Sequence, residues 1–396
     1  MKQKILAIFI SVLMLCPVLL GLQPVVSAQE NSTVWDGAAD TSWYQKGQTS
    51  FTLSTAQELA GLSALTWQGV SFEGVDITLV ADIDLAGIEW TPIGESAQSY
   101  QPDVVPFRGN FDGGGHIISN LKIRGDGGGT YGLFGFAIES TIENLGLENV
   151  DVNVIRSPGV EGEIDAGTLI GDINNGVVNN CYATGTLSVH TGHDCQSAIG
   201  GLVAYQYVSG TSYSTPIGMI TNCYSAVDII SNSSDNTVDQ NQVTGGVVGW
   251  NNAEQGGTAL IENCFYTGTI TDTHEGNEYA NYIGGIAGAN ITWDRSEDTP
   301  SAAVIRNSFV SGSIVAPASD VTYIGNVTIQ IFEGSNVENC YWDDSMEGEG
   351  IVSEGGTTNI NDAAPVSPAE IVTPAFLQKL NQGQATAAWT FDANGK

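Results

Sequence analysis

The apolar residues of this chain recur in short phrases separated by polar residues and glycine, and two phrases return together along residues 131–345. One phrase is an aliphatic residue, any residue, then Asn, usually followed by Cys or Ser and an aromatic residue. It occurs six times, with its asparagine at Asn144, Asn180, Asn222, Asn263, Asn307 and Asn339. These asparagines are separated by 36, 42, 41, 44 and 32 residues. A recurring period in this range indicates a solenoid.

The second phrase combines glycine with aliphatic residues and precedes each asparagine phrase, as in GLFG at 132, GGLVA at 200 and GGVVG at 245. Both phrases are short and rich in aliphatic residues, Cys and aromatics, which is typical of strands. Runs at helical spacing are missing from the repeats, which excludes helical arrays. We therefore predict an all-β, right-handed parallel β-helix with about two coils of roughly 20 residues per repeat. A propeller with blades of about 42 residues is the alternative.

The repeated residues have physical roles in such a stack. Glycine pairs allow the sharp corners between strands. The asparagines can form a ladder of amide hydrogen bonds along the corners, with a sugar-binding row as the alternative. Four cysteines occupy one equivalent position: Cys181, Cys223, Cys264 and Cys340. Two coils would separate neighbouring cysteines by roughly 9–10 Å, beyond the roughly 7 Å limit for disulfides, so free buried thiols are expected.

The first 28 residues have the pattern of a secretory leader. Lys2 and Lys4 precede an apolar stretch, and small residues at 26–28 predict cleavage before Gln29. A retained signal anchor is the alternative. We expect an exported chain, secreted or associated with the cell surface, without a membrane span after cleavage, because no second apolar stretch approaches the roughly 20 residues that a span requires.

The ends of the solenoid have their own patterns. Residues 29–72 are predicted as an N-terminal cap whose short helix begins at Ser54 or Thr55, with Gln57 or Glu58 completing a capping box. The β-helix is assigned to 73–345. Residues 346–364 are rich in glycine and acidic residues and are predicted as a linker. Residues 365–396 are predicted as a C-terminal helical cap and tail, interrupted at Pro374.

The charge balance restricts the partners. Lys and Arg number 11 against 44 Asp and Glu, and removing Lys2 and Lys4 with the leader changes the formal charge from −33 to −35. Such a surface repels nucleic acid and anionic lipid. The sequence indicates no cofactor and does not determine the oligomeric state.

The two phrases together resemble the GLUG repeats of bacterial secreted and cell-surface proteins. FTLSTAQELAGL at 51, ITLVADIDLAGIEWTPIG at 77 and FRGNFDGGGHIISNLKI at 107 are similar to the segment that precedes those repeats. The resemblance covers about residues 51–345 and implies a β-helical, adhesin-like protein. GLUG segments also occur beside the catalytic domain of immunoglobulin A peptidases. Their His-Glu-x-x-His zinc motif does not occur in this chain.

The candidate binding residues are aromatics assigned to the variable loops. They are Tyr205, Tyr207, Tyr213, Tyr279, Tyr282 and Trp293. Aromatic side chains combine apolar area with a polar group, which suits contact with glycans or proteins. A weak metal candidate combines two imidazoles, a carboxylate and a thiolate within six residues, at His190, His193, Asp194 and Cys195.

These observations predict a non-enzymatic, adhesin-like protein that binds a glycan or a host or bacterial surface protein. A polysaccharide lyase or hydrolase on the same fold is the alternative, with Asp82, Asp84 and Asp112 as conceivable carboxylates. These aspartates are also suited to bond the backbone of turns. A structural spacer is the third possibility.

Overall fold

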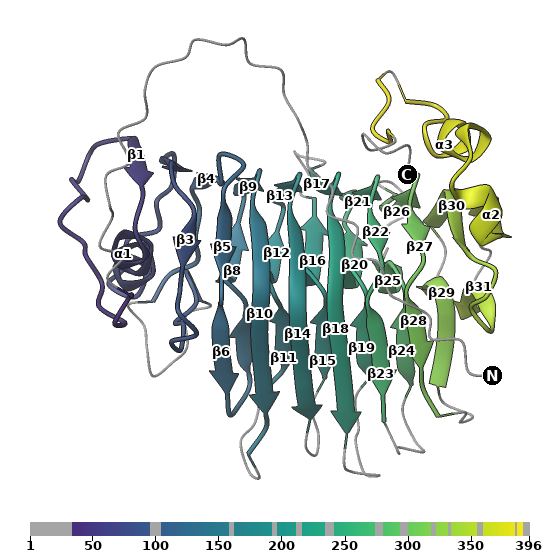
Figure 1. The fold of residues 1–396 in the computed structure, drawn as a ribbon, viewed down its shortest axis with the longest axis horizontal. Helices are drawn as coiled ribbons and strands as arrows, with labels where there is room; N and C mark the ends of the chain where they lie inside the picture. The colour runs from purple at the N-terminus through teal and green to yellow at the C-terminus, as the bar shows by residue number, and fades with distance from the viewer. Residues whose placement is uncertain are drawn as a thin grey trace, which may run out of the picture.

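The structure is a computed structural model. It describes residues 34–95, 104–157, 162–191, 196–210, 216–233, 241–273, 280–293, 300–317, 322–331, 334–354, 359–384 and 386–390. Strands stack in parallel into two long sheets, as Figure 1 shows. The predicted all-β parallel β-helix is thereby confirmed.

The larger sheet, here called sheet A, contains β1 (Ser50–Leu53), β2 (Asp76–Leu79), β3 (Ile83–Asp84), β4 (Asn110–Asp112), β5 (Ile117–Ser119), β6 (Lys122–Gly125), β9 (Thr141–Glu143), β10 (Gly146–Ile155), β13 (Val177–Asn179), β14 (Tyr182–Thr191), β17 (Ile217–Thr221), β18 (Tyr224–Ser233), β21 (Thr258–Glu262), β22 (Phe265–Tyr266), β23 (Thr269–Asp272), β26 (Ala302–Arg306), β27 (Phe309–Val310), β28 (Ser313–Val315), β30 (Ser335–Asp343) and β32 (Asn359–Val366).

The second sheet, here called sheet B, contains β7 (Gly129–Tyr131), β8 (Phe134–Ile138), β11 (Ile164–Gly167), β12 (Ile170–Asn174), β15 (Ser197–Gly200), β16 (Val203–Ser209), β19 (Gln242–Gly245), β20 (Val248–Glu254), β24 (Asn281–Gly284), β25 (Ala287–Trp293), β29 (Thr322–Ile331) and β31 (Glu349–Glu354). The main core lies between the sheets and is filled by aliphatic side chains from every coil, such as Ile170, Val203 and Ile261.

Each repeat forms one coil, and the prediction of two coils per repeat is wrong. The strand before each asparagine pairs directly with its equivalent in the next repeat, as Asn179 does with Thr221 and Glu262 with Arg306. The glycine phrase supplies strands to sheet B and the asparagine phrase supplies strands to sheet A of the same coil. Equivalent residues are therefore one strand spacing apart, about 4.8 Å. The expected separation of roughly 9–10 Å between neighbouring cysteines is wrong for the same reason, and distance does not exclude a disulfide, although the four described thiols are free.

The six repeated asparagines all turn corners in sheet A. Each adopts a positive φ between 52° and 56°, the left-handed region that Asn tolerates better than most residues. Three neighbouring pairs are joined by amide hydrogen bonds: the Nδ2 atoms of Asn180, Asn263 and Asn339 donate to the Oδ1 atoms of Asn144, Asn222 and Asn307 over 2.9, 3.1 and 2.7 Å.

The amide row is interrupted at two steps. Asn222 Nδ2 donates to Asn179 Oδ1 over 2.8 Å instead of to Asn180. Asn307 Nδ2 lies 3.3 Å from Glu262 Oε1, while the Oδ1 of Asn263 accepts from Gln384 Nε2 over 2.6 Å. The ladder therefore consists of joined pairs of asparagines. At one interruption, Gln384 of the C-terminal segment donates to Asn263 in place of the next asparagine.

Both ends of the stack carry helices (Figure 1). The helix α1 (Ala56–Thr66) has Thr55 as its N-cap and a capping box with Glu58, which satisfies backbone groups that a helix start leaves unpaired. Its Leu59, Leu62 and Leu65 are buried and cover the N-terminal end of the core.

The C-terminal cap consists of α2 (Pro368–Ile371) and α3 (Pro374–Leu380), each with a proline at its start, a position that tolerates proline because its N–H would be unpaired in any case. Phe376 is buried, and its ring centroid lies 5.4 Å from that of Phe309 and 5.3 Å from that of Tyr341. None of the helices in the described ranges is long and apolar enough to cross a membrane.

Residues 346–364 are not the predicted linker, because β31 and much of β32 lie there. Their backbone pairs in register with β29 and β30, for example Ile351 with Thr328 and Ile360 with Val337. Strand pairing needs backbone groups rather than apolar side chains, so the low hydrophobicity of this segment concealed it.

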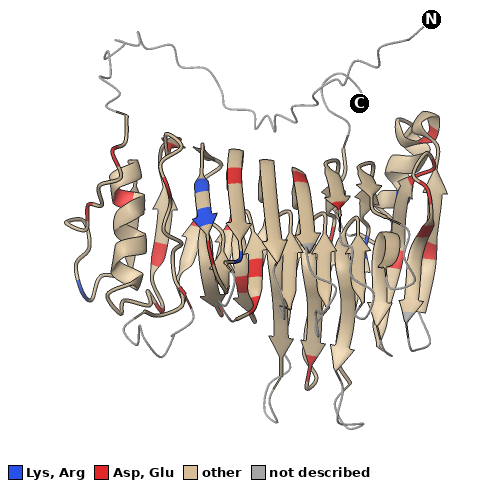
Figure 2. Ribbon diagram, turned by 90° about the horizontal axis from the view of Figure 1, so that it is seen from below, with Lys and Arg blue, Asp and Glu red and all other residues tan. Residues whose placement is uncertain are grey.

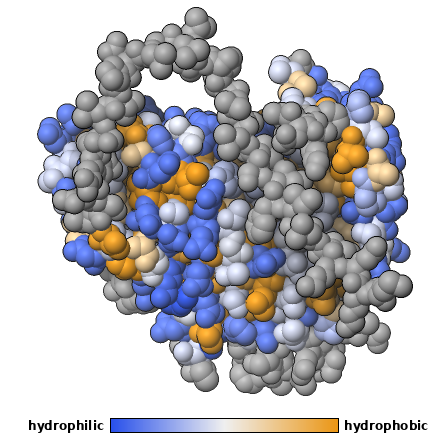
Figure 3. Space-filling model, viewed as in Figure 1, coloured by the Kyte–Doolittle hydropathy of each residue, from blue (hydrophilic) through white to orange (hydrophobic). Residues whose placement is uncertain are grey.

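Acidic residues are spread over the length of the stack, and few basic residues lie among them (Figure 2). On the face seen in Figure 3, the apolar side chains of the described residues lie in small groups among hydrophilic ones. This surface offers no single large apolar patch in that view.

The corner conformation predicts an unusual order of stability. Replacing Asn222 by Ala places a Cβ in the left-handed region, which costs about 1–2 kcal/mol, and removes the side-chain hydrogen bond, worth about 0.5–1.5 kcal/mol. Asn222→Gly loses the hydrogen bond and keeps the favourable φ. We expect denaturant unfolding to rank the chains wild type, Gly, then Ala. A glycine variant that is no more stable than the alanine variant would contradict this account of the corner.

The cysteine row predicts the reactivity of the thiols. Cys181, Cys223, Cys264 and Cys340 are free and buried, and burial raises the pKa of the Cys340 thiol to about 12. Burial is outweighed at Cys223 by hydrogen bonds with Cys181 and Cys264, which lower the pKa of its thiol, so the expected inertness of the row rests on the inaccessibility of all four sulfur atoms. A thiol reagent should leave all four untouched in the native mature chain carrying Cys195→Ser, and should label four in denaturant. Rapid labelling of the folded chain would show that the row is accessible.

Candidate functional site

The outer face of sheet B carries two neighbouring columns of aromatic and polar side chains. Six residues, here called the tyrosine face, form a grid on three adjacent strands: Asp172 and Asn174 of β12, Tyr205 and Tyr207 of β16, and Trp250 and Asn252 of β20. Asp172, Tyr205 and Trp250 are register partners in one column, and Asn174, Tyr207 and Asn252 are partners in the other.

The alternation of side chains along a strand places these residues outside the main core. Ile173, between Asp172 and Asn174, belongs to the main core. Its register partners Gln206 and Asn251 are buried in the same column. Asn251 Nδ2 donates to Ala259 O of sheet A over 3.2 Å, which shows that this column points between the two sheets. The flanking residues therefore point to the opposite side.

The aromatic rings of the tyrosine face contact one another. The ring centroids of Tyr205 and Tyr207 are 6.1 Å apart, and those of Tyr205 and Trp250 are 6.0 Å apart in an edge-to-face arrangement. Asn252 Nδ2 donates to Tyr205 Oη over 2.9 Å, and Tyr207 Oη donates to Glu254 Oε2 over 3.1 Å. Trp250 is buried with a second apolar cluster that includes Ala198, Val243 and Tyr282. This packing fixes the orientation of the rings.

Four polar atoms of the tyrosine face are buried without a hydrogen-bond partner in the described part of the chain. They are Asp172 Oδ1, Asn174 Oδ1, Trp250 Nε1 and Asn252 Oδ1. Buried polar groups are nearly always paired with protein or water, because an unpaired one costs about 1–3 kcal/mol. A hydrogen-bonding molecule on this face would relieve that cost.

A group of carboxylates adjoins the tyrosine face. Asp165 of β11 and Asp172 lie on one coil, with Glu95 and Glu163 close enough to influence both. Glu95 is held by Thr130, whose Oγ1 donates to Glu95 Oε1 over 2.7 Å. Burial, reinforced by Glu95 and Glu163, raises the pKa of Asp172 to about 8. Burial and the neighbouring Asp172 raise the pKa of Asp165 well above its usual value.

The predicted binding aromatics are only partly brought together. Tyr205 and Tyr207 lie in a strand rather than in a loop, since the regular pairing of β16 extends through both. Tyr282 lies in β24, buried, with its ring 5.5 Å from that of Tyr323. Trp293 ends β25 and is 40% exposed. Tyr213 and Tyr279 lie outside the described residues.

Of the four candidate metal ligands, the structure describes only His190. His190 is the penultimate residue of β14, and its Nε2 lies 3.2 Å from Ser188 Oγ. His193, Asp194 and Cys195 lie outside the described residues. Among the residues that the structure describes, no group of three His, Cys, Asp or Glu side chains could hold a metal ion.

The conceivable catalytic aspartates bond to turns. Asp82 Oδ1 accepts from Ile117 N over 3.1 Å, and Asp84 Oδ1 accepts from Ala86 N over 2.7 Å. Asp112 Oδ1 accepts from Gly114 N over 2.8 Å. These bonds explain the aspartates as parts of the corners, in agreement with the structural alternative.

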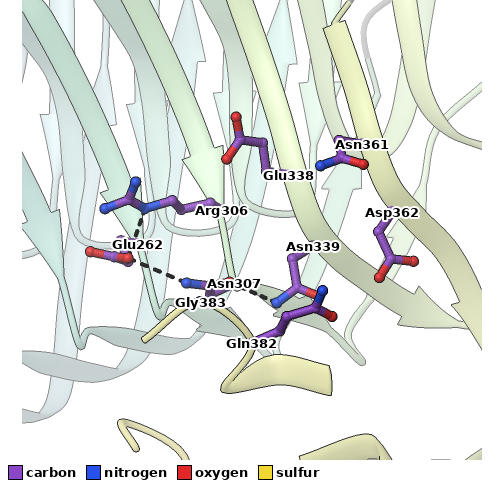
Figure 4. A pocket seen from close by; sticks show the side chains of 9 residues that line it. All are labelled: Glu262, Arg306, Asn307, Glu338, Asn339, Asn361, Asp362, Gln382 and Gly383. Carbon is purple, nitrogen blue, oxygen red and sulfur yellow. Dashed lines mark hydrogen bonds and ion pairs between the residues drawn. The ribbon is translucent and has the colours of Figure 1, made fainter. Parts of the chain in front are cut away.

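A small pocket of about 340 Å³ lies where the residues after α3 meet sheet A, as Figure 4 shows. Its lining is polar and includes Glu262, Glu338 and Asp362. Arg306 Nε donates to Glu262 Oε1 over 2.7 Å, so the positive charge of Arg306 is partly neutralised. A second hollow of about 620 Å³ lies over the turns at Asn120 and Asn149. Neither lining contains an aromatic side chain, so both fit an organic ligand less well than the tyrosine face.

Sequence reasoning missed four residues of the tyrosine face: Asp172, Asn174, Trp250 and Asn252. The signal was present in the glycine phrases: IGDIN at 170, VAYQY at 203 and VGWNN at 248 align residue by residue. The third and fifth positions of these phrases form the two columns of the tyrosine face. The fourth positions, Ile173, Gln206 and Asn251, point into the coil.

Comparison with known proteins gives partial matches. No family model matches the chain. The chain is 30% identical over 172 residues, 42% of its length, to halomucin of Haloquadratum walsbyi. It is 31% identical over 150 residues, 36% of its length, to a putative Gly-rich membrane protein of Evansella cellulosilytica. It spans only 2% and 16% of these two relatives.

Among solved structures, an IgA1 protease superposes with a TM-score of 0.48 at 16% identity, over 82% of this chain and 22% of that one. The resemblance to GLUG-repeat proteins stays a prediction.

Proposed function

We propose that this chain is a non-enzymatic, adhesin-like binding protein of the cell exterior that contacts a glycan through the tyrosine face. The observation that carries the proposal is the combination of partly buried tyrosines with buried polar atoms that have no partner among the described residues. Glycan-binding surfaces pair aromatic rings with amides and carboxylates in this way because sugars present both C–H faces and hydroxyl groups. The leader pattern and the similarity to a Gly-rich membrane protein support an exported or surface location.

The geometry favours rigid recognition. The tyrosine face lies on three adjacent strands of a continuous sheet, and strands hold side chains more accurately than loops do. Asn252 and Glu254 fix the hydroxyl groups of the two tyrosines. A ligand would therefore meet rings that are already oriented, which lowers the entropy cost of binding.

A polysaccharide-active enzyme is the second candidate, and one observation favours it. Asp165 and Asp172 are neighbouring carboxyl groups on one coil, each with a raised pKa, and paired carboxylates of unequal acidity perform glycoside hydrolysis. Release of reducing ends from a polysaccharide by the mature chain, lost in Asp172→Asn, would establish the enzyme.

The binding proposal predicts a difference between two strand tyrosines. The mature chain should bind at least one immobilised glycan on an array, and Tyr207→Ala should weaken that binding by about tenfold or more, about 1.4 kcal/mol, when measured by calorimetry. The matched control is Tyr182→Ala, because Tyr182 is a half-buried tyrosine of sheet A that donates to Glu148. Circular dichroism would confirm that both variants fold.

Three results would refute the proposal. They are an array without any bound glycan, an equal loss of affinity in Tyr207→Ala and Tyr182→Ala, and binding unaffected by Tyr207→Ala. The first would favour the structural spacer, and the others would place the ligand elsewhere on the coil.

A further inference from the structure

The tyrosine face is bordered by acidic side chains on both sides. Glu95, Glu163 and Asp165 approach Asp172 on the side of β11, and Glu254 contacts Tyr207 on the side of β20. None of the residues in this group is basic, and the whole chain has a formal charge of −33. An anionic ligand would therefore meet like charges in a partly buried setting, where screening by salt is weak.

The unpaired atoms call for both donors and acceptors in the ligand. Asn174 Oδ1 and Asn252 Oδ1 can only accept, and Trp250 Nε1 can only donate. A hydroxyl group does both, since it has one proton and two lone pairs. A chain of uncharged sugars presents such groups at every residue, together with apolar C–H surface for the tyrosine rings.

The protonation state of Asp172 would affect the binding of a ligand. Within its column its register partners are Phe136 of β8 and Tyr205 of β16, neither of which can neutralise a charge. Among the described residues, Glu95 and Glu163 are the charged groups that raise its pKa, and Asp165 is its acidic neighbour on the same coil. In this position the acid form is favoured, and a protonated carboxyl group can donate a hydrogen bond as well as accept one.

We propose, on the basis of the proposed function, that the tyrosine face selects uncharged glycans and that Asp172 binds them as a neutral carboxylic acid. The pKa of Asp172, raised to about 8, sets the pH range of this effect. The acid form predominates below pH 8 and is lost above it. Affinity is therefore highest at neutral or lower pH and falls as pH rises through about 8.

The test measures affinity for defined probes at pH 6 and pH 9 by calorimetry. Neutral cello-, manno- and chito-oligosaccharides are compared with oligogalacturonate and heparin oligosaccharides. We expect a neutral probe to bind and to lose about tenfold in affinity at pH 9, where a group with a pKa near 8 is only about one-tenth protonated. The acidic probes should bind at least tenfold more weakly than the neutral one.

Two variants distinguish the effect of Asp172 from the effect of its acidic neighbours. Asp172→Asn keeps an uncharged donor and acceptor of the same shape, so binding should persist with less than a twofold difference between pH 6 and pH 9. Glu163→Gln removes one of the charges that raise the pKa of Asp172, so the midpoint of the pH dependence should move to lower pH. Asp151→Asn changes an aspartate of sheet A and should leave the wild-type profile unchanged.

The outcomes distinguish the inference from the function on which it rests. Preference for an acidic glycan, or a pH profile unchanged in Asp172→Asn, would overturn the inference while leaving a glycan-binding protein. Capture of a protein and no glycan, or binding that survives Tyr207→Ala, would overturn the proposed function as well.

Discussion

The fold depends on one constraint, the left-handed corner at the asparagine of each repeat. The corner holds because Asn adopts a positive φ at low cost and because its amide reaches the neighbouring coil. Every repeat turns at the same residue, so the coils stack in register despite repeat lengths between 32 and 44 residues. The differences in length are absorbed between strands. Register then brings every equivalent position into a column, including the buried cysteines behind the corners.

Columns separate the structural and the variable parts of each repeat. In sheet B, the column of Ile173, Gln206 and Asn251 lies inside the coil. Asn251 Nδ2 is paired there, while the side-chain polar atoms of Gln206 and the Oδ1 of Asn251 have no partner among the described residues. The outer columns differ from coil to coil in their residues, although Trp250 and Asn252 are themselves buried. Recognition can therefore change along the rod without altering the fold, which is the general advantage of solenoids as binding scaffolds.

The sequence predicted the solenoid, the parallel strands and both capping helices, because periodicity and capping residues are local signals. It did not predict one coil per repeat, since a period gives the length of a repeat and not its number of turns. It missed β31 and β32 because their pairing uses backbone atoms. Tyr205 and Tyr207 were found by residue type, yet their position in a strand and their contact with Trp250 depend on register between repeats. The acidic group was missed because Glu95 reaches Asp165 and Asp172 only in three dimensions.

The two half-buried aspartates differ from the residues at the same positions of the adjacent coils. Asp165 has Thr130 and Ala198 as its register partners, and Asp172 has Phe136 and Tyr205. The same columns therefore accept small or aromatic side chains without charge on the adjacent coils. Burying two neighbouring carboxyl groups costs stability, because each must remain protonated or be charged beside the other. The adjacent coils carry uncharged residues at both positions, and the proposed glycan site would give the two carboxyl groups a use, since departures from local rules of this kind concentrate at functional sites.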